Sequence, residues 1–452
     1  MAMSKTGGAS LASGLLSALA SKIIAVAGGP SNVAILATLQ QARQAGLVAA
    51  TANGQTALVQ GTGSFEGSRR REYVRTAAWI MSGLTFAVSS TFVAWSWWGG
   101  HAPGSLAAGV AGRFALAPPL VGWLAAPLIL SSVFVFMSAM LNALGGVGAL
   151  AGIQVATSLA MLIGAPLAAR FAAEHHPQAL VGLMAFAAAV SIAGAALSLT
   201  AYGEQIRDWF GGSGKRWSAE AARHFFAIAG SMSVSGFAAS TVLLMVRGHI
   251  TKAVGLEITG QFDAAWNVSM NQASLVLGSL QTHYLPALVS ARDRDEKSGR
   301  LSSVLMAGSV VAAVVIAVLA LAKPWVLTIL YSRAFRPATA CLRWTLLGDY
   351  LKVSSWIVSI PILAAADMKL FLFADLLACS AFPIAAAGLE GRLGAAEAAS
   401  VGFVLMYVVH LSFCAVMLWK RHRLHPSRSA LLVWCAGLGA VGAASAIGWN
   451  ES

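Results

Sequence analysis

Long apolar segments and short polar connections alternate along the whole chain. The apolar runs are about 20 residues long, the length that an α-helix needs to cross the hydrocarbon core of a bilayer. The pattern predicts an all-α polytopic membrane protein in which no segment resembles a soluble domain. The predicted spans are 9–28, 32–60, 76–98, 115–142, 147–169, 178–200, 225–247, 258–288, 301–322, 341–363, 368–388 and 394–419, with a thirteenth candidate at 431–449.

Two predicted spans carry polar residues along one helix face. In 258–288 the steps between them are three or four residues, which places on one face Asp263, Asn267, Asn271, Ser274, Gly278 and Gln281. A looser stripe in 32–60 consists of Gln40, Arg43, Gln44, Thr51 and Gln55. Polar faces at membrane depth pack against other helices or line a water-filled cavity. Hydrogen bonding between helices is the alternative interpretation, and the length of the first stripe favours a cavity wall.

Composition and charge agree with a membrane protein. The chain has 452 residues, of which 58% are hydrophobic and 10% charged, whereas soluble domains carry about 25% charged residues. The net charge of +13 would indicate nucleic-acid binding in a soluble protein. Here the Lys and Arg residues of the connections gather on the side of the N-terminus, which places that terminus in the cytoplasm. The four cysteines lie in apolar spans without CxxC spacing, which is typical of small buried residues.

The connection 201–224 divides the spans into two blocks. It mixes Trp209 and Trp217 with Arg207, Lys215 and Arg216, a composition typical of an interfacial helix. We therefore expect an N-terminal six-helix lobe (1–200), a cytoplasmic linker (201–224), a C-terminal six-helix lobe (225–421) and a possible further span (430–449). Repeated lobes of this kind are a transporter architecture with the substrate path between the halves.

Several charged residues lie within the spans or at their ends, where each needs a partner or water. They are Lys22, Arg43, Arg247, Asp263, Asp349, Lys352 and Asp375. Asp349 and Lys352 are three residues apart and can pair, either as a structural lock or as functional groups. Arg43 has no acid within helical reach and is the better candidate for a ligand cation. Lys22 and Arg247 have the alternative of extending to the membrane interface.

Other candidate chemistry is sparse. The chain has no P-loop, GxSxG or HExxH motif, so no cofactor is expected. Energy must then come from a proton or sodium gradient or from consumption of the product. His175 and His176 fit a solvated loop better than a metal site. Trp123, Trp266 and Trp356 lie deep in spans, where core packing is the simpler interpretation than stacking on a sugar.

The stretch Gly348-Asp349-Tyr350-Leu351-Lys352-Val353 contains the pattern Gly-Asp-x-Leu-Lys-Val. This pattern resembles a signature of Wzx-type lipid-linked oligosaccharide flippases, especially the enterobacterial common antigen type, a family related to the O-antigen translocases. Ala374-Asp375, Tyr284-Leu285-Pro286 and the run from Lys22 to Pro30 match as well. The similarity is collinear over about residues 9–421. One departure is Leu39-Gln40-Gln41 in place of the family's Phe-Arg-Gln, and Arg43 is the candidate replacement for that arginine.

The resemblance implies the MATE-like fold of the MOP superfamily, with two lobes around a central cavity in the bacterial inner membrane. It implies passage of an undecaprenyl-pyrophosphate-linked oligosaccharide to the periplasmic leaflet, in company with a polymerase and chain-length proteins. The pyrophosphate needs cations and the sugar needs hydrogen-bonding groups. The predicted substrate-binding residues are Lys22, Gln40, Arg43, Gln44, Arg247, Asp263, Asn267, Asn271, Gln281, Asp349, Lys352 and Asp375.

Two other functions stay open at this point. An ion-coupled drug or small-solute antiporter of the same fold would use few cations and an acidic coupling site, for which Asp263 is the candidate. A membrane-embedded polysaccharide polymerase or ligase would need a sizeable outer loop with catalytic residues. The predicted outer connections, about 99–114 and 323–340, are short and poor in acids, which argues against such an enzyme.

Overall fold

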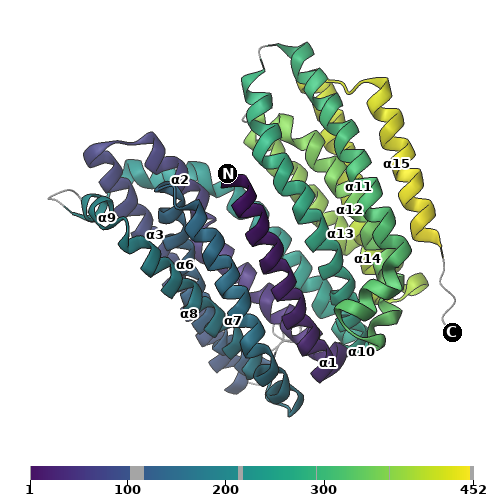
Figure 1. The fold of residues 1–452 in the computed structure, drawn as a ribbon, viewed down its shortest axis with the longest axis horizontal. Helices are drawn as coiled ribbons and strands as arrows, with labels where there is room; N and C mark the ends of the chain where they lie inside the picture. Colours follow the sequence, from purple (N-terminus) through teal and green to yellow (C-terminus); the bar gives the residue numbers. More distant parts are fainter. Residues whose placement is uncertain (1, 102–116, 212–216, 292, 366, 448–452) are drawn as a thin grey trace. The chain divides into compact units, whose positions relative to one another are not determined.

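The computed structural model describes residues 2–101, 117–211, 217–291, 293–365 and 367–447, and all regular secondary structure in these ranges is helical (Figure 1). Among the described residues, eleven helices are long and apolar enough to cross a membrane. Large apolar side chains are exposed along them, for example Ile163, Leu197, Val318 and Ile384. Exposed apolar surface on this scale is typical of contact with lipid. The prediction of an all-α multi-pass membrane protein is confirmed.

Two long helices are each broken at a glycine. In α1 (Ala2–Thr51), Gly29 has φ of 64°, and in α10 (Ala219–Ser290), Gly255 has φ of 87°. Only glycine adopts this left-handed region readily, so the chain turns at these points and then resumes a helix. The breaks coincide with the predicted gaps between spans 9–28 and 32–60 and between spans 225–247 and 258–288. Each long helix therefore carries two of the predicted spans.

The contacts divide the chain into two compact units, residues 1–248 and 249–452. The division lies within α10, later than the predicted linker 201–224. The first part of α10 packs on the N-terminal unit, where Phe225 is fully buried and the Asn53 side chain donates to the Met232 carbonyl at 2.9 Å. Packing thus assigns this helix to the first unit, while the six-plus-six lobe division stays a prediction.

The N-terminal unit is a bundle of helices packed through small residues. After α1 come α2 (Gly54–Ser64), α3 (Gly67–His101), α5 (Pro118–Trp123), α6 (Ala125–Ala143), α7 (Val147–Ala173), α8 (Gln178–Thr200) and α9 (Gly203–Phe210). The helix α1 runs beside α7 (Figure 1), and the buried contacts include Ala20, Ala165 and Ala169. Small side chains let membrane helices approach closely.

The predicted interfacial segment is only partly interfacial. Its helix, α9, has eight residues, and Trp209 is buried in a core cluster with Tyr73 and Phe225. Trp217 is exposed, and the Arg75 guanidinium donates to the Phe210 carbonyl at 2.8 Å. The indole of Trp209 therefore anchors the segment to the bundle. Sequence composition gave no sign of this anchoring because a tryptophan among cations fits both environments.

The C-terminal unit is built around α12 (Thr339–Ala364), most of whose residues are buried. It continues from α10 through α11 (Arg294–Leu330), the 3-10 turn η1 (Arg333–Ala338), α12, α13 (Met368–Leu393), α14 (Ala395–Met417), the π-helical turn η2 (Leu418–His422) and α15 (Arg428–Ala446). The helix α12 packs on α14 and α11, and α13 packs on α14. The residues of α12 are thereby held inside this unit.

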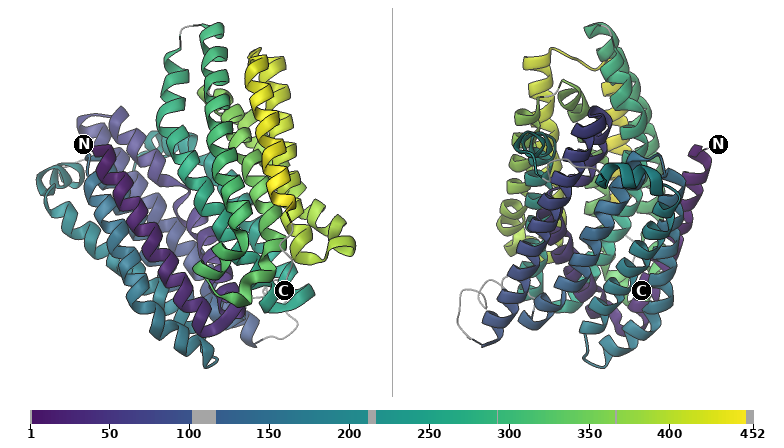
Figure 2. Two further views of the ribbon diagram at one scale, coloured as in Figure 1. Left: turned by 45° about the vertical axis from the view of Figure 1, so that its right-hand side comes forward. Right: turned by 90° about the vertical axis from the view of Figure 1, so that its left-hand side faces the viewer.

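The last helix, α15, corresponds to the thirteenth candidate span and packs on α11 and α12 (Figure 2). The Tyr350 hydroxyl donates to the Trp434 carbonyl, and the Trp434 indole donates to the Ser354 hydroxyl, both at 2.8 Å. Lys323 is buried and its ammonium donates to the Ser445 and Ile447 carbonyls at 3.1 and 2.8 Å. A cation at these terminal carbonyls is favourable because they have no partner within the helix. The helix is thus docked along its length.

The docking of α15 depends on a glycine. A Cβ atom at Gly437 would overlap the Tyr350 hydroxyl, whereas a Cβ at Gly439 meets nothing within 4 Å. We expect Gly437→Ala to cost about 1–3 kcal/mol through overpacking. Gly439→Ala should be neutral or stabilising, because alanine is the better helix former. Melting temperatures in detergent check this pair, and equal temperatures for both variants would contradict the docking.

Candidate functional site

In the N-terminal unit, a buried arginine links α10 to α1. Arg247 is 3% exposed, and its Nη1 donates to the Gln41 Oε1 at 3.0 Å. Gln41 in turn donates from Nε2 to the Ser240 carbonyl at 3.0 Å. Arg247 therefore lies inside the bundle and does not extend to the interface, which rules out that alternative. Gln41, which the sequence stripe had left out, is the residue that makes the connection.

Arg43 is a cation of this unit with unused hydrogen-bond donors. Its Nη1 donates to the Ser131 hydroxyl of α6 at 2.7 Å. Its buried Nε has no hydrogen-bond partner among the described residues. A guanidinium carries five N–H donors in a rigid fork that matches phosphate oxygens. Ser131 thus fixes one arm of the fork and leaves further donors for an anionic ligand.

The other predicted residues of this unit do not form one continuous wall. Lys22 and Gln40 are half-buried, Gln44 and Gln55 are exposed, and Thr51 is buried with its hydroxyl bonded to the Leu47 carbonyl of its own helix. The helix also turns at Ala52 and Asn53, which both have positive φ. The stripe 40–55 therefore spans a bend and several environments.

In the C-terminal unit, Asp349 is fully buried and held by α10. Its Oδ2 accepts from the Ser269 hydroxyl at 2.7 Å and from the Gln272 amide at 2.8 Å. Its Oδ1 has no hydrogen-bond partner among the described residues. Ser269 and Gln272 were missed in the sequence, although their spacing of three residues puts them on one face of the helix. A buried carboxylate with one unsatisfied oxygen is suited to take up a cation.

Lys352 does not make the predicted ion pair with Asp349. Its Nζ lies 3.1 Å from the Met270 Sδ and 6.0 Å from the centre of the Tyr407 ring. The two residues share a face of α12, but the carboxylate bonds to Ser269 and Gln272 of α10, whereas the ammonium lies between Met270 of α10 and the Tyr407 ring of α14. Lys352 is half-buried, and the face of the Tyr407 ring stabilises its positive charge.

Beyond Tyr407 the polar side chains continue to α13. The His410 Nε2 lies 3.2 Å from the Asp375 Oδ1, and the His410 ring makes an edge contact with Tyr407. His410 is 5% exposed. Asp349, Lys352, Tyr407, His410 and Asp375 therefore form a chain of titratable and aromatic groups across α12, α14 and α13. The sequence had indicated both aspartates and the lysine as site residues, and for His410 it offered proton linkage without placing the residue in the site.

The stripe that begins at Asp263 changes environment along its helix. Asp263 is fully buried, Asn267 is half-buried and Asn271 is exposed, whereas the side chains of Ser274, Gly278 and Gln281 lie outside the described residues. Burial raises the pKa of the neighbouring Tyr331 to about 12; a hydrogen bond to Asn267 opposes this rise, and the charge of Asp263 adds to it. Asp263 is thus buried inside the C-terminal unit, and its place in the wall of a substrate cavity stays a prediction.

The deep tryptophans are placed by packing. Trp266 is buried and stacks on Phe382 with ring centres 6.1 Å apart and an interplanar angle of 6°. It also makes an edge contact with Phe403 at 4.8 Å. This confirms the core-packing interpretation for Trp266. Trp123, by contrast, is 63% exposed.

No protein-family model matches the sequence. The chain is 24% identical over 184 residues to the lipid III flippase of Escherichia coli (strain K12), a match that covers 39% of this chain and 43% of that flippase. The lipid III flippase of Shigella flexneri matches to the same extent. The aligned stretch thus spans less than half the length of these curated relatives.

Among solved structures, the lipid II flippase MurJ in its inward closed conformation matches with a TM-score of 0.73, over 99% of this chain and 94% of that one, at 12% identity. The chain has a MurJ- and MATE-like fold. An inward-facing multidrug resistance MATE family transporter of the MOP superfamily matches with a TM-score of 0.61, over 97% of this chain and 96% of that one, at 13% identity. These two neighbours of similar fold are a flippase and a transporter.

Proposed function

We propose that this protein is a Wzx-type flippase, which moves an undecaprenyl-pyrophosphate-linked oligosaccharide repeat unit from the cytoplasmic to the periplasmic leaflet of the bacterial inner membrane. Its pathway is the synthesis of a surface polysaccharide such as O-antigen lipopolysaccharide or an exopolysaccharide. The observation that carries the proposal is the agreement of two comparisons. The sequence match is to a lipid III flippase, and a solved structure of similar fold is a lipid II flippase.

The residues of the N-terminal unit support an anionic cargo. A pyrophosphate has several oxygens that accept charge-assisted hydrogen bonds, and arginine is suited to bind them with two parallel donors. Arg43 is held at one arm by Ser131 and has a buried Nε with no described partner. We assign the pyrophosphate to Arg43, with Lys22, Gln40 and Gln44 of the same helix near the saccharide.

An ion gradient is the proposed energy source, with a proton or sodium ion in place of any organic cofactor. The fully buried Asp349 supports this, because a buried carboxylate favours neutralisation by a proton or a metal ion. The lobes would alternate access by rocking, with the N-terminus in the cytoplasm. A polymerase and chain-length proteins of the same pathway would consume the product.

A leaflet-sidedness assay tests the function. In a deletion strain, we expect the lipid-linked oligosaccharide to accumulate where only cytoplasmic-side reagents reach it, and re-expression of the protein should expose it to an added periplasmic glycosidase. The purified protein in liposomes should likewise expose a short-chain pyrophosphate-linked oligosaccharide to the outer face. Normal movement in the deletion strain would contradict the proposal.

The second candidate is an ion-coupled antiporter, which the similarity to MATE transporters favours. That function would use Asp263 as the coupling acid for a cationic solute. We expect Asp263→Asn to leave surface polysaccharide at its normal level if the flippase proposal holds. Ion-dependent efflux of a cationic dye that Asp263→Asn abolishes would instead support the antiporter.

A further inference from the structure

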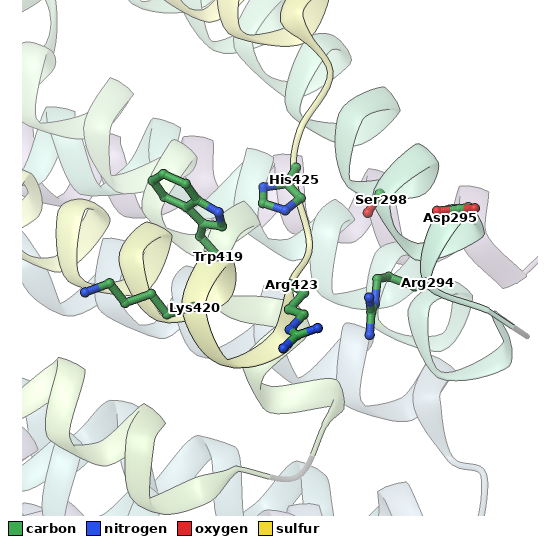
Figure 3. Close-up of a pocket in the computed structure, with 7 residues that line it drawn as sticks. All are labelled: Arg294, Asp295, Ser298, Trp419, Lys420, Arg423 and His425. Carbon is green, nitrogen blue, oxygen red and sulfur yellow. The ribbon is translucent and has the colours of Figure 1, made fainter.

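A basic pocket lies at one end of the C-terminal unit, away from the buried polar chain. The pocket has a volume of about 470 Å³ and is lined by Arg294 and Asp295 at the start of α11 and by Trp419, Lys420, Arg423 and His425 at and after η2 (Figure 3). This volume is within the range of small-molecule sites. All its residues belong to one compact unit, at the end predicted to face the cytoplasm.

The cations of the pocket are not neutralised within the described part of the chain. There, no hydrogen bond or ion pair engages the side chains of Arg294, Lys420 or Arg423, and the single acid of the lining is Asp295. The neighbouring Arg421 differs, because its Nε lies 2.9 Å from the Asp367 carboxylate. Arg421 is thus paired with Asp367, whereas Arg294, Lys420 and Arg423 leave an excess of positive charge at the pocket.

The backbone at Arg423 has two unusual features, a π-helical turn before it and a left-handed conformation at Arg423 itself. The turn η2 is π-helical, and Arg423 ends it with φ of 52° and ψ of 36°. The left-handed region is costly for a residue with a Cβ atom, and both features concentrate at functional sites. The Leu424 amide donates to the Leu418 carbonyl at 3.2 Å and closes the turn. Figure 3 shows that Arg423 and Arg294 line the pocket from two different segments.

The pocket also lies at the ends of helices that are long and apolar enough to cross a membrane. It is where α14 ends and where α11 and α15 begin, so it is close to the ends of three candidate spans. Trp419 is 63% exposed and its ring makes an edge contact with His425. Exposed tryptophans at span ends lie among lipid headgroups. Val416, one turn earlier on α14, is exposed and offers apolar surface to an acyl chain.

We propose that this pocket binds the phosphate of an anionic phospholipid headgroup. Arg294 and Arg423 hold the phosphate with paired guanidinium donors, Lys420 contributes charge at the edge, and Trp419 packs on the glycerol region of the lipid. The site is separate from the proposed substrate path and does not depend on the flippase function. Its effect is to couple the stability of the C-terminal unit to the anionic lipid content of the membrane.

The test compares lipids and variants on the purified, delipidated full-length protein in detergent at fixed salt. We expect phosphatidylglycerol to bind roughly 10- to 100-fold more tightly than phosphatidylcholine, measured by tryptophan fluorescence and by the rise in melting temperature. Arg294→Gln combined with Arg423→Gln should remove this preference. Arg428→Gln is the matched control, because it removes an exposed arginine at the same end of the unit that does not line the pocket.

Each contrary result overturns the assignment. A double variant that keeps the phosphatidylglycerol preference shows that the pocket is not the binding site. A loss of equal size in Arg428→Gln shows general attraction to the positive end of the unit. If inorganic phosphate alone raises the melting temperature as much as phosphatidylglycerol, the ligand is soluble phosphate and not a lipid. None of these measurements involves transport, so their outcome is independent of whether the flippase proposal holds.

Discussion

Replacing Arg43 with alanine is expected to lower translocation of the lipid-linked oligosaccharide by roughly 10- to 100-fold, because a charge-assisted hydrogen bond contributes about 1.5–3 kcal/mol. The side chain is half-buried, and Ser131 is its described partner. The fold should therefore survive the truncation. The measurement is the initial rate of oligosaccharide exposure in liposomes, with the melting temperature as a check on folding.

Three matched variants separate charge from position. Arg43→Lys keeps the charge without the fork and should recover part of the rate. Ser131→Ala leaves the guanidinium intact and removes its anchor, so the loss should stay below roughly 10-fold. Arg247→Ala removes a buried residue that bonds to Gln41, and should lower the melting temperature more than Arg43→Ala does. Full surface polysaccharide from Arg43→Ala at low expression would remove Arg43 from the pyrophosphate site.

The membrane spans could be predicted well because length and apolarity decide which segments cross a bilayer. Even the breaks at Gly29 and Gly255 lie in predicted gaps, and the thirteenth candidate corresponds to α15. The division into units was not predictable in the same way. It depends on which bundle the first part of α10 packs against, and residues such as Phe225 look the same in either case.

The partners of the polar residues were the least predictable part. Spacing along one helix tells which side chains share a face, but not which helix lies opposite. Asp349 and Lys352 share a face of α12, and Asp349 bonds to Gln272 of α10, while Lys352 lies between Met270 of α10 and the Tyr407 ring of α14. Gln41 is adjacent to the predicted Gln40 and makes the buried contact with Arg247. The sequence therefore located the polar regions but not their bonds.

The second large effect is expected at Asp349, where stability and coupling can be separated. Asp349→Ala leaves the Ser269 hydroxyl and the Gln272 amide buried without their acceptor. Each unsatisfied group costs about 1–3 kcal/mol, so we expect a markedly lower melting temperature. Asp349→Asn keeps an oxygen that accepts both bonds, and it should restore most of the lost stability.

Asparagine nevertheless cannot bind or release a proton or compensate the charge of a sodium ion. If Asp349 takes part in ion coupling, Asp349→Asn folds normally and responds weakly to an imposed proton or sodium gradient. If Asp349 only ties α12 to α10, the same variant transports as the wild type does, because the hydrogen bonds that fix the helices are retained. Translocation in liposomes with and without each gradient distinguishes the two, and wild-type stimulation of Asp349→Asn would contradict a coupling role. We expect Asp349→Asn to fold normally and to respond weakly to the gradient. A neutral amide would be enough to tie α12 to α10, whereas the Asp349 carboxylate has an Oδ1 without a described partner.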